Sequence, residues 1–117
     1  MERAKNENID ALLGCIEGSR GGDRSLDESI AVFVGHKFER RGQIPHYTTS
    51  YDASMAMLPQ GFSFHLNFGA HMGESRAYIC QNDGTDTGNL KFEGRAGIAD
   101  APRAICAAAI RARNALR

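Results

Sequence analysis

Apolar residues recur with a helical period at the start of the chain. In residues 9–18 they occupy the i, i+3, i+4 and i+7 positions of one helix face: Ile9, Leu12, Leu13 and Ile16. Asn6 or Asn8 can cap the start of this helix, and Gly18 is a suitable end. The pattern therefore predicts an N-terminal amphipathic helix.

A second helix is predicted over residues 25–35, after a glycine-rich loop at 18–24. Ser25 and Glu28 have the spacing of a capping box, and Gly35 can end the helix. Its apolar stripe consists of Leu26, Ile30, Phe33 and Val34. The two N-terminal helices are thus expected to follow each other closely.

A third, shorter helix is predicted just before Pro59, which cannot continue it. Thr49 or Ser50 can cap its start. The residues expected to share its buried face are Tyr51, Met55 and Leu58. The methionines in this helix are expected to fill gaps in the core.

The period then changes from helical to alternating. Over residues 62–68, phenylalanine and leucine alternate with serine, histidine and asparagine, which is typical of a strand with one apolar face. Residues 75–80 and 89–98 are further strand candidates, and Asp83-Gly84 between them is suited to a hairpin turn. These segments predict one antiparallel sheet.

The last nineteen residues predict a C-terminal helix that packs closely on this sheet. Asp100 is a suitable N-cap, and Pro102 is suited to the first turn. Its expected buried face is narrow and consists mostly of small residues: Ile105, Cys106, Ala109 and Ile110. A helix lying on a membrane surface needs larger apolar anchors, so a packing role is favoured.

Together these elements predict an α+β protein in which an antiparallel sheet is packed with helices, resembling an α-β-α sandwich. At 117 residues the chain is expected to form a single small domain over 1–117. Residues 1–24 would hold the N-terminal helix and loop. Residues 25–117 would hold two helices, the antiparallel meander and the C-terminal helix.

Composition excludes several classes of function. The chain has 14 Lys and Arg and 14 Asp and Glu, and this balance argues against a partner that is a DNA or RNA polymer. No apolar segment is long enough to span a membrane, and the chain opens without a signal-like segment. Three widely spaced cysteines fit a reducing compartment. A cytoplasmic protein without a membrane partner is expected.

Enzymatic motifs are not found. The four histidines, His36, His46, His65 and His71, include no pair with i, i+4 spacing, so a metal site is not expected and surface positions are favoured. The sequence also contains no nucleophile elbow and no glycine-rich phosphate loop after a strand. The expectation is a protein without catalytic activity, metal or cofactor.

Arginines near aromatic residues are the remaining chemical signal. Arg103 lies in the first turn of the last helix, where backbone N–H groups and a guanidinium can together bind a phosphate. Residues near the strands and the second helix could add a base-stacking surface and further cations. The candidate ligand-binding residues are Arg103, Asp100, Tyr78, Phe92, Arg76, Arg95 and Arg24. A set of solvated surface charges remains the alternative for each arginine.

Three segments resemble a family of small phage and prophage proteins, the ABA-sandwich type. They are SRGGDRSLDESIAVFVG, HYTTSYDASMAMLPQGFSFHL and APRAICAAAIRAR, and the resemblance covers most of the chain from residue 9 onward. The third segment resembles the closing helix of that family most distinctively. One departure is Arg103, at a position where the family pattern usually has a small or apolar residue.

The resemblance implies a role like that of the phage anti-Thoeris proteins, which sequester cyclic ADP-ribose isomers without cleaving them. It implies a small-molecule cyclic nucleotide as the ligand, extending to cyclic oligonucleotides, and a homo-oligomer, a dimer or hexamer, as the assembly. Two other classes stay open. One is a phage accessory protein that inhibits a host protein by direct contact, marked by an exposed apolar patch. The other is a hydrolase of such a signal.

Overall fold

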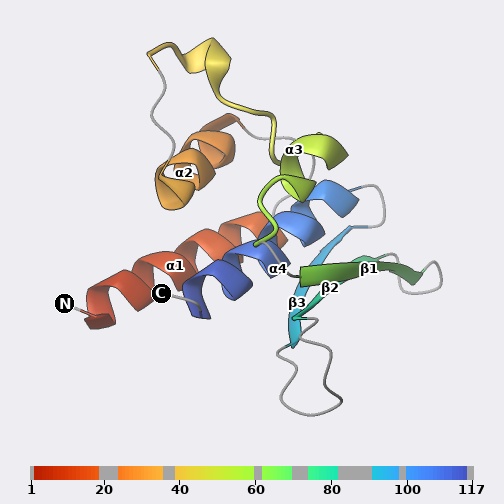
Figure 1. Ribbon diagram of the computed structural model, residues 1–117. Helices are drawn as coiled ribbons and strands as arrows, with labels where there is room; N and C mark the ends of the chain where they lie inside the picture. The colour runs from red at the N-terminus through yellow and green to blue at the C-terminus, as the bar shows by residue number, and fades with distance from the viewer. Residues whose placement is uncertain are drawn as a thin grey trace.

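The computed structural model describes residues 2–18, 24–35, 39–59, 62–69, 74–81, 91–97 and 100–115. Helices precede a three-stranded sheet, and a last helix follows it (Figure 1). The elements in chain order are α1 (Glu2–Gly18), α2 (Arg24–Val34), the short 3-10 helix η1 (Arg41–Gln43), α3 (Tyr51–Met55), β1 (Phe62–Gly69), β2 (Glu74–Gln81), β3 (Lys91–Gly97) and α4 (Ala101–Ala115).

The three strands form one antiparallel sheet in the order β1-β2-β3, so the predicted meander is confirmed. In β1 the apolar side chains are half-buried and the intervening polar ones are exposed, as a period of two requires. The pairing of Phe64 with Ile79, and of Ile79 with Phe92, aligns the apolar positions of all three strands on one face. The Asp83-Gly84 turn lies outside the described residues.

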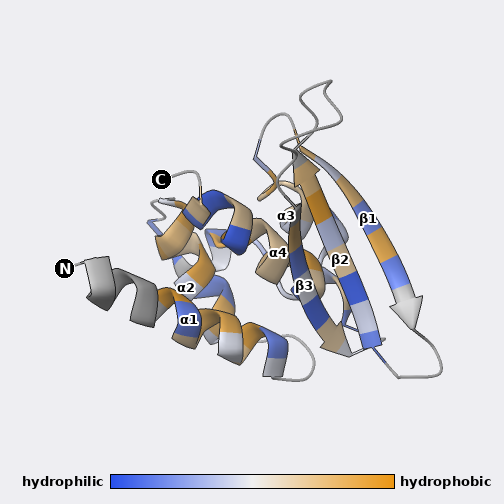
Figure 2. Ribbon diagram, turned by 90° about the horizontal axis from the view of Figure 1, so that it is seen from below, coloured by the Kyte–Doolittle hydropathy of each residue, from blue (hydrophilic) through white to orange (hydrophobic). Residues whose placement is uncertain are grey.

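The helices lie to one side of this sheet (Figure 2). Helix α4 packs on β3 and β2, α1 and α3 pack against α4, and α2 packs on α1. The α+β class with helices packed on an antiparallel sheet is therefore confirmed. Among the described elements the layers follow the order sheet, α4, then α1 with α2. The second face of the sheet is consequently left open by these helices, unlike in a sandwich with helices on both faces.

Helix α4 is buried on every side over its first ten residues. Every residue from Ala101 to Ile110 is buried, so the narrow buried face predicted from the sequence is wrong. Ala107, which lies off that predicted face, is as fully buried as Ala109. The physical reason is that small side chains let the sheet, α1 and α3 all approach α4 closely, which leaves residues 101–110 no solvent-facing side.

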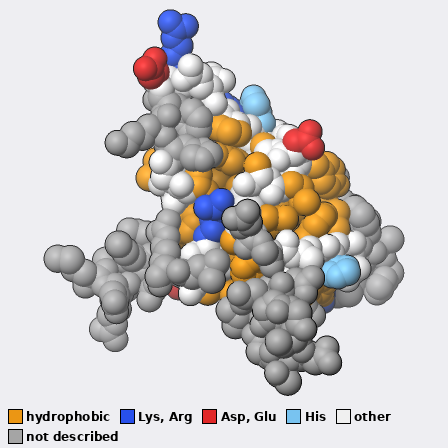
Figure 3. Space-filling model, in the orientation of Figure 1, with side chains coloured by type: hydrophobic (Ala, Val, Ile, Leu, Met, Phe, Trp, Pro, Cys, Tyr) orange, Lys and Arg blue, Asp and Glu red, His pale blue; other side chains and the backbone are white. Residues whose placement is uncertain are grey.

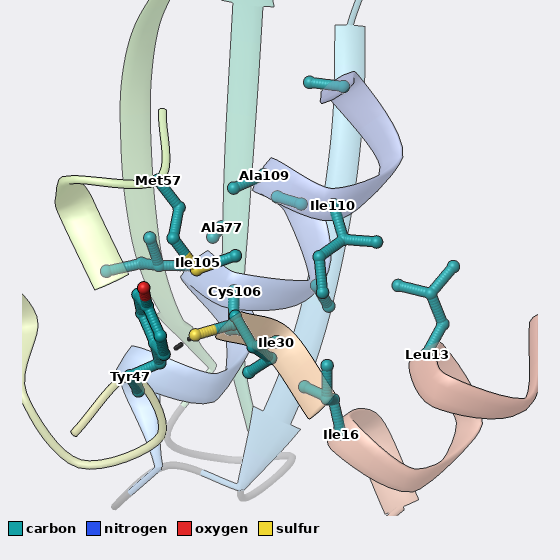
Figure 4. Close-up of a cluster of buried hydrophobic side chains, with 14 of the residues drawn as sticks. Leu13, Ile16, Ile30, Tyr47, Met57, Ala77, Ile105, Cys106, Ala109 and Ile110 are labelled. Atoms are coloured by element: carbon teal, nitrogen blue, oxygen red, sulfur yellow. Dashed lines mark hydrogen bonds between the residues drawn. The ribbon is translucent and has the colours of Figure 1, made fainter. Parts of the chain in front are cut away.

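The core joins α4 to all the other helices. Ile16 of α1, Ile30 of α2 and Met57 beyond α3 are almost fully buried against it (Figure 4). Cys106 of α4 donates a thiol hydrogen bond to the backbone oxygen of Tyr47 at 3.1 Å. Burial raises the pKa of this thiol strongly, so it stays protonated as a donor. The expectation that Cys15 and Cys106 are both small buried residues is confirmed for Cys106 and wrong for Cys15, which is exposed.

The ends of α1 and α2 match the sequence-based prediction at the C-termini, but the two helices begin earlier than predicted. Helix α1 starts at Glu2, so neither Asn6 nor Asn8 caps it. Helix α2 already includes Arg24, which places Ser25 inside the helix and rules it out as the cap. At the other end, Gly35 has φ 82° and its N–H donates to the Val32 oxygen, a left-handed ending that suits glycine.

Helix α3 begins as predicted but buries a different face. The Ser50 hydroxyl accepts a hydrogen bond from the Ala53 N–H at 3.2 Å, which confirms it as the N-cap. Tyr51, predicted as part of the buried face, is 48% exposed. Ser54 and Met57 are buried instead. Five residues form little more than one turn, and so the helical period carries little information about burial there.

Candidate functional site

The open face of the sheet brings three of the predicted ligand-binding residues together. Arg76 and Tyr78 alternate along β2 with the buried Ala77, so both point away from α4. Arg95 of β3 lies directly opposite Arg76 in the register. The sheet thus places two guanidinium groups and one phenol ring on the same face, which no described helix covers.

Strand β1 adds polar side chains to this face. His65 pairs with Tyr78 and Asn67 pairs with Arg76, and both β1 residues are exposed. A hollow of about 390 Å³ lies here, lined by His65, Asn67, Tyr78 and Cys80. Hydrogen-bonding groups beside an aromatic ring are suited to an unpaired nucleobase. We call this surface, residues 65, 67, 76, 78 and 95, the open-face site.

Carboxylates hold the arginines of the open-face site. Arg76 binds Glu74 on its own strand, with N–O distances of 2.8 and 2.9 Å. The Arg95 Nε lies 3.2 Å from the Glu93 carboxylate, and the Arg76 Nε lies 4.0 Å from the same oxygen. Hydrogen bonding to Glu74, then to Tyr78, raises the pKa of Arg76, so it stays cationic.

The two carboxylates and two guanidinium groups of this surface alternate in sign, and their charges sum to zero. In order they are Glu74, Arg76, Glu93 and Arg95. Glu93 lies between the two arginines, at 3.2 Å from Arg95 and 4.0 Å from Arg76. Arg95 is 54% exposed and is the more accessible of the two arginines. An anion that binds here has to compete with Glu93, because a guanidinium shared with a carboxylate offers less attraction to a second anion.

Arg103 does not belong to this site, and the sequence-based prediction for it is wrong. Its side chain is 0% exposed, and its guanidinium donates to the Cys15 oxygen of α1 at 3.0 Å. It joins α1 to α4 inside the core, where it is closed off from solvent.

Phe92 and Arg24 are also placed away from the open-face site. Phe92 lies on the helix-facing side of β3, with its ring centroid 6.2 Å from that of Phe62. Arg24 binds Asp27 at 2.9 Å and the Ile44 carbonyl oxygen at 3.0 Å, so its partners lie in α2 and the segment before α3 and not on the sheet. Asp100 precedes α4 at the N-cap position, and its carbonyl accepts the Arg103 N–H.

Asp27 is the centre of a buried polar cluster that the sequence did not indicate. Its side chain is 1% exposed, and one carboxylate oxygen accepts both the backbone N–H and the hydroxyl of Thr48 at 2.9 Å. The other oxygen accepts from Arg24. The Arg24 guanidinium also binds the Ile44 carbonyl. These bonds fasten residues 44–48 to α2, so this is a structural cluster.

The sequence pattern also did not predict that Cys80 and His65 lie close together on the sheet. They are fifteen positions apart, yet antiparallel pairing brings both to the wall of the same hollow. Glu74 and Glu93 were likewise not predicted as part of the site. Strand alternation places each of them on the open face, but only the register between strands shows which residues are neighbours.

Metal ligation and membrane insertion find no support in the described part of the chain. No group of three or more His, Cys, Asp or Glu side chains there is arranged to hold a metal ion. No described helix is long and apolar enough to cross a membrane. Comparisons with family models, with curated proteins and with solved structures find no match for this chain.

Proposed function

We propose that this protein binds and sequesters a cyclic nucleotide on the open face of its sheet, without cleaving it. The observation that carries the proposal is the convergence of five polar and aromatic side chains on the sheet face that no described helix covers: His65, Asn67, Arg76, Tyr78 and Arg95. In the cytoplasm of an infected bacterium, such binding would remove an immune signal. The resemblance to phage proteins supports this context, with a cyclic ADP-ribose isomer as the first ligand to test.

The open-face site offers separate positions for the two parts of such a ligand. A phosphate would bind Arg95, the more exposed arginine, while Arg76 is held in place by Glu74. A purine would stack on Tyr78, with its edge toward His65 and Asn67 at the hollow. This assignment replaces the sequence-based one, in which the phosphate bound at the start of α4 with Arg103.

Binding is tested by calorimetry with cyclic ADP-ribose isomers and with cyclic di- and trinucleotides. Arg95→Ala and Tyr78→Ala are each expected to weaken binding by about ten- to a hundredfold, because each removes a direct contact with the ligand. Arg40→Ala is the matched control, since Arg40 is exposed and lies outside the sheet. It is expected to bind like the parent protein.

Recovery of the ligand separates sequestration from catalysis. After binding, the protein is denatured by heat and the released nucleotide is analysed. Intact nucleotide supports sequestration, whereas an altered nucleotide would indicate a hydrolase and point to Cys80 and His65 in the hollow. Absence of binding by the parent protein to every nucleotide in the panel would contradict the proposal.

The charge of Glu93 gives a second prediction with the opposite sign. Glu93→Gln keeps the shape of the side chain but removes the negative charge beside Arg95 and Arg76. Affinity for a phosphate-bearing nucleotide is therefore expected to rise by roughly two- to fivefold, the range of about 0.4–1 kcal/mol that removing one exposed ion pair gives. Glu39→Gln, exposed and outside the sheet, is the control. Equal or weaker binding by Glu93→Gln would place the phosphate elsewhere.

Direct contact with a host protein is the second candidate function, and one surface favours it. A mostly apolar hollow of about 480 Å³ lies between α1 and α2, with Leu12, Leu26 and Phe33 in its walls. Val32 at its margin is 79% exposed. This is the exposed apolar patch expected of a protein that inhibits by contact. Absence of nucleotide depletion in the recovery experiment would favour this function.

A further inference from the structure

The two edges of the sheet differ in how their backbone groups are satisfied. Along β3, the outward N–H of Arg95 donates to the Glu17 carboxylate of α1 at 2.9 Å. The outward carbonyl of Glu93 accepts a hydrogen bond from Arg111 of α4, and Arg111 also binds Glu17. Side chains of two helices therefore occupy the β3 edge, and no further strand can pair there without displacing them.

The β1 edge has no such cover among the described elements. Strand β1 pairs with β2 on one side, and on the other side no described helix or strand runs beside it (Figures 1 and 2). The eight residues 62–69 contain no proline and no charged residue. Natural edge strands are commonly protected by charges, prolines or bulges, and β1 carries neither charge nor proline.

The apolar side of β1 is also incompletely covered. Helix α4 packs mainly on β3 and β2, so β1 lies at the margin of the layer that α4 covers. Phe62, Phe64 and Leu66 consequently stay half-buried at the margin of the core, while Ile79 of β2 is fully buried. Figure 3 shows hydrophobic side chains gathered on the surface that carries α3 and β1. A neighbouring apolar strand would cover this strip.

We infer that β1 pairs antiparallel with β1 of a second copy of this chain, giving a six-stranded sheet across a twofold axis. With the axis at His65, Phe64 would lie opposite Leu66 of the second copy, and Ser63 opposite Asn67. Apolar residues would then lie opposite apolar ones and polar residues opposite polar ones. With the axis at residue 65, even-numbered positions pair with even-numbered ones and odd-numbered with odd-numbered ones. The strand is thus complementary to itself.

The same geometry explains why a second copy is favoured over an unrelated strand. A copy supplies the matching half-buried apolar strip and an uncharged edge, so no like charges oppose each other. With the β3 edge occupied, pairing through β1 closes after two copies and cannot extend into a fibre. The two open faces would form one continuous surface, with His65 and Asn67 of both copies at its centre. This inference does not depend on the identity of a ligand.

Sedimentation equilibrium of the full chain tests the inference without any ligand. The parent protein is expected to be a dimer, at twice the monomer mass of 12.7 kDa. Substituting Ser63→Lys together with Asn67→Lys would oppose two like-charged pairs across the axis, and is expected to weaken the dimer by roughly tenfold or more. Substituting Ser63→Lys together with Asn67→Glu makes the same pairs attractive, and is expected to restore or tighten the dimer.

Both positions are exposed, so the two double variants are expected to fold alike, which their melting temperatures would check. A parent protein that is monomeric at about 100 μM, well above the Kd of a specific dimer, would overturn the inference. Equal dimerisation of the two double variants would overturn it as well, since that result places the contact on another surface. Open-ended assemblies of the parent protein would contradict the closed pairing.

Discussion

Gly94→Ala is expected to be the most destabilising single-methyl change in the described part of this protein. A Cβ at Gly94 would lie 2.0 Å from the backbone oxygen of Ala104 and 2.6 Å from the backbone nitrogen of Ala108. Neither backbone atom can turn away as the end of a long side chain could, so α4 would have to move off the sheet. Ordinary overpacking costs about 1–3 kcal/mol, and this substitution is expected to reach or exceed the upper value.

Urea denaturation measures this loss, with Gly14→Ala as the matched control. Gly14 lies within α1 and has no atom within 4 Å of its would-be Cβ. Since alanine is the better helix former, Gly14→Ala is expected to raise the free energy of unfolding by about 0.5–1 kcal/mol. Two glycine-to-alanine changes should therefore act in opposite directions. A Gly94→Ala protein as stable as the parent would refute the close approach of α4 to β3.

Asp27→Ala is expected to have the second large effect. It removes the acceptor that the Thr48 N–H and hydroxyl share, and the counter-charge of Arg24. Breaking a buried ion pair from one side costs about 3–5 kcal/mol. Because the Arg24 side chain is 32% exposed and can be partly hydrated, a loss of about 3 kcal/mol is expected. That is a large fraction of the total of about 5–15 kcal/mol for a small domain.

A graded series makes the prediction for Asp27 specific. Asp27→Asn keeps one oxygen as an acceptor for Thr48 but loses the charge and the second acceptor, which binds Arg24, so it is expected to cost about 1–2 kcal/mol. Glu39→Ala removes an exposed carboxylate and is expected to change stability by less than about 0.5 kcal/mol. Denaturant unfolding should show the largest loss of stability for Asp27→Ala, a smaller loss for Asp27→Asn and the smallest for Glu39→Ala. If Asp27→Ala were no worse than Glu39→Ala, the cluster would not be holding residues 44–48 to α2.

Local periodicity was enough to predict the secondary structure and the class of the fold. The alternation over residues 62–68 predicted β1 because successive side chains of a strand point to opposite faces, whatever lies beyond them. Ser50 as a cap and Gly35 as an ending were also predictable, because each acts through atoms a few residues away. Arg76 and Tyr78 were named only as candidates near the strands, and the structure places both on the open face of β2, two positions apart.

Burial of α4 could not be predicted from the sequence pattern. Alanine has high helix propensity on any face, so its presence in α4 does not reveal which faces are covered. The burial of Arg103 was equally unpredictable. A charged residue is expected at the surface, and the backbone oxygen that accepts its hydrogen bond is 88 residues away. Its assignment to a phosphate site was wrong because nothing local distinguishes a buried arginine from an exposed one.

The candidate site was determined partly by sequence and completed only by the tertiary structure. The sequence singled out Tyr78, Arg76 and Arg95 as candidates by residue type, but only the register put Arg95 opposite Arg76 and His65 opposite Tyr78. Phe92 has the same chemistry as a stacking residue, yet one position along β3 places it on the covered face. Period and propensity are short-range properties of the chain, whereas register, burial and the neighbours of a charge arise only when distant segments meet.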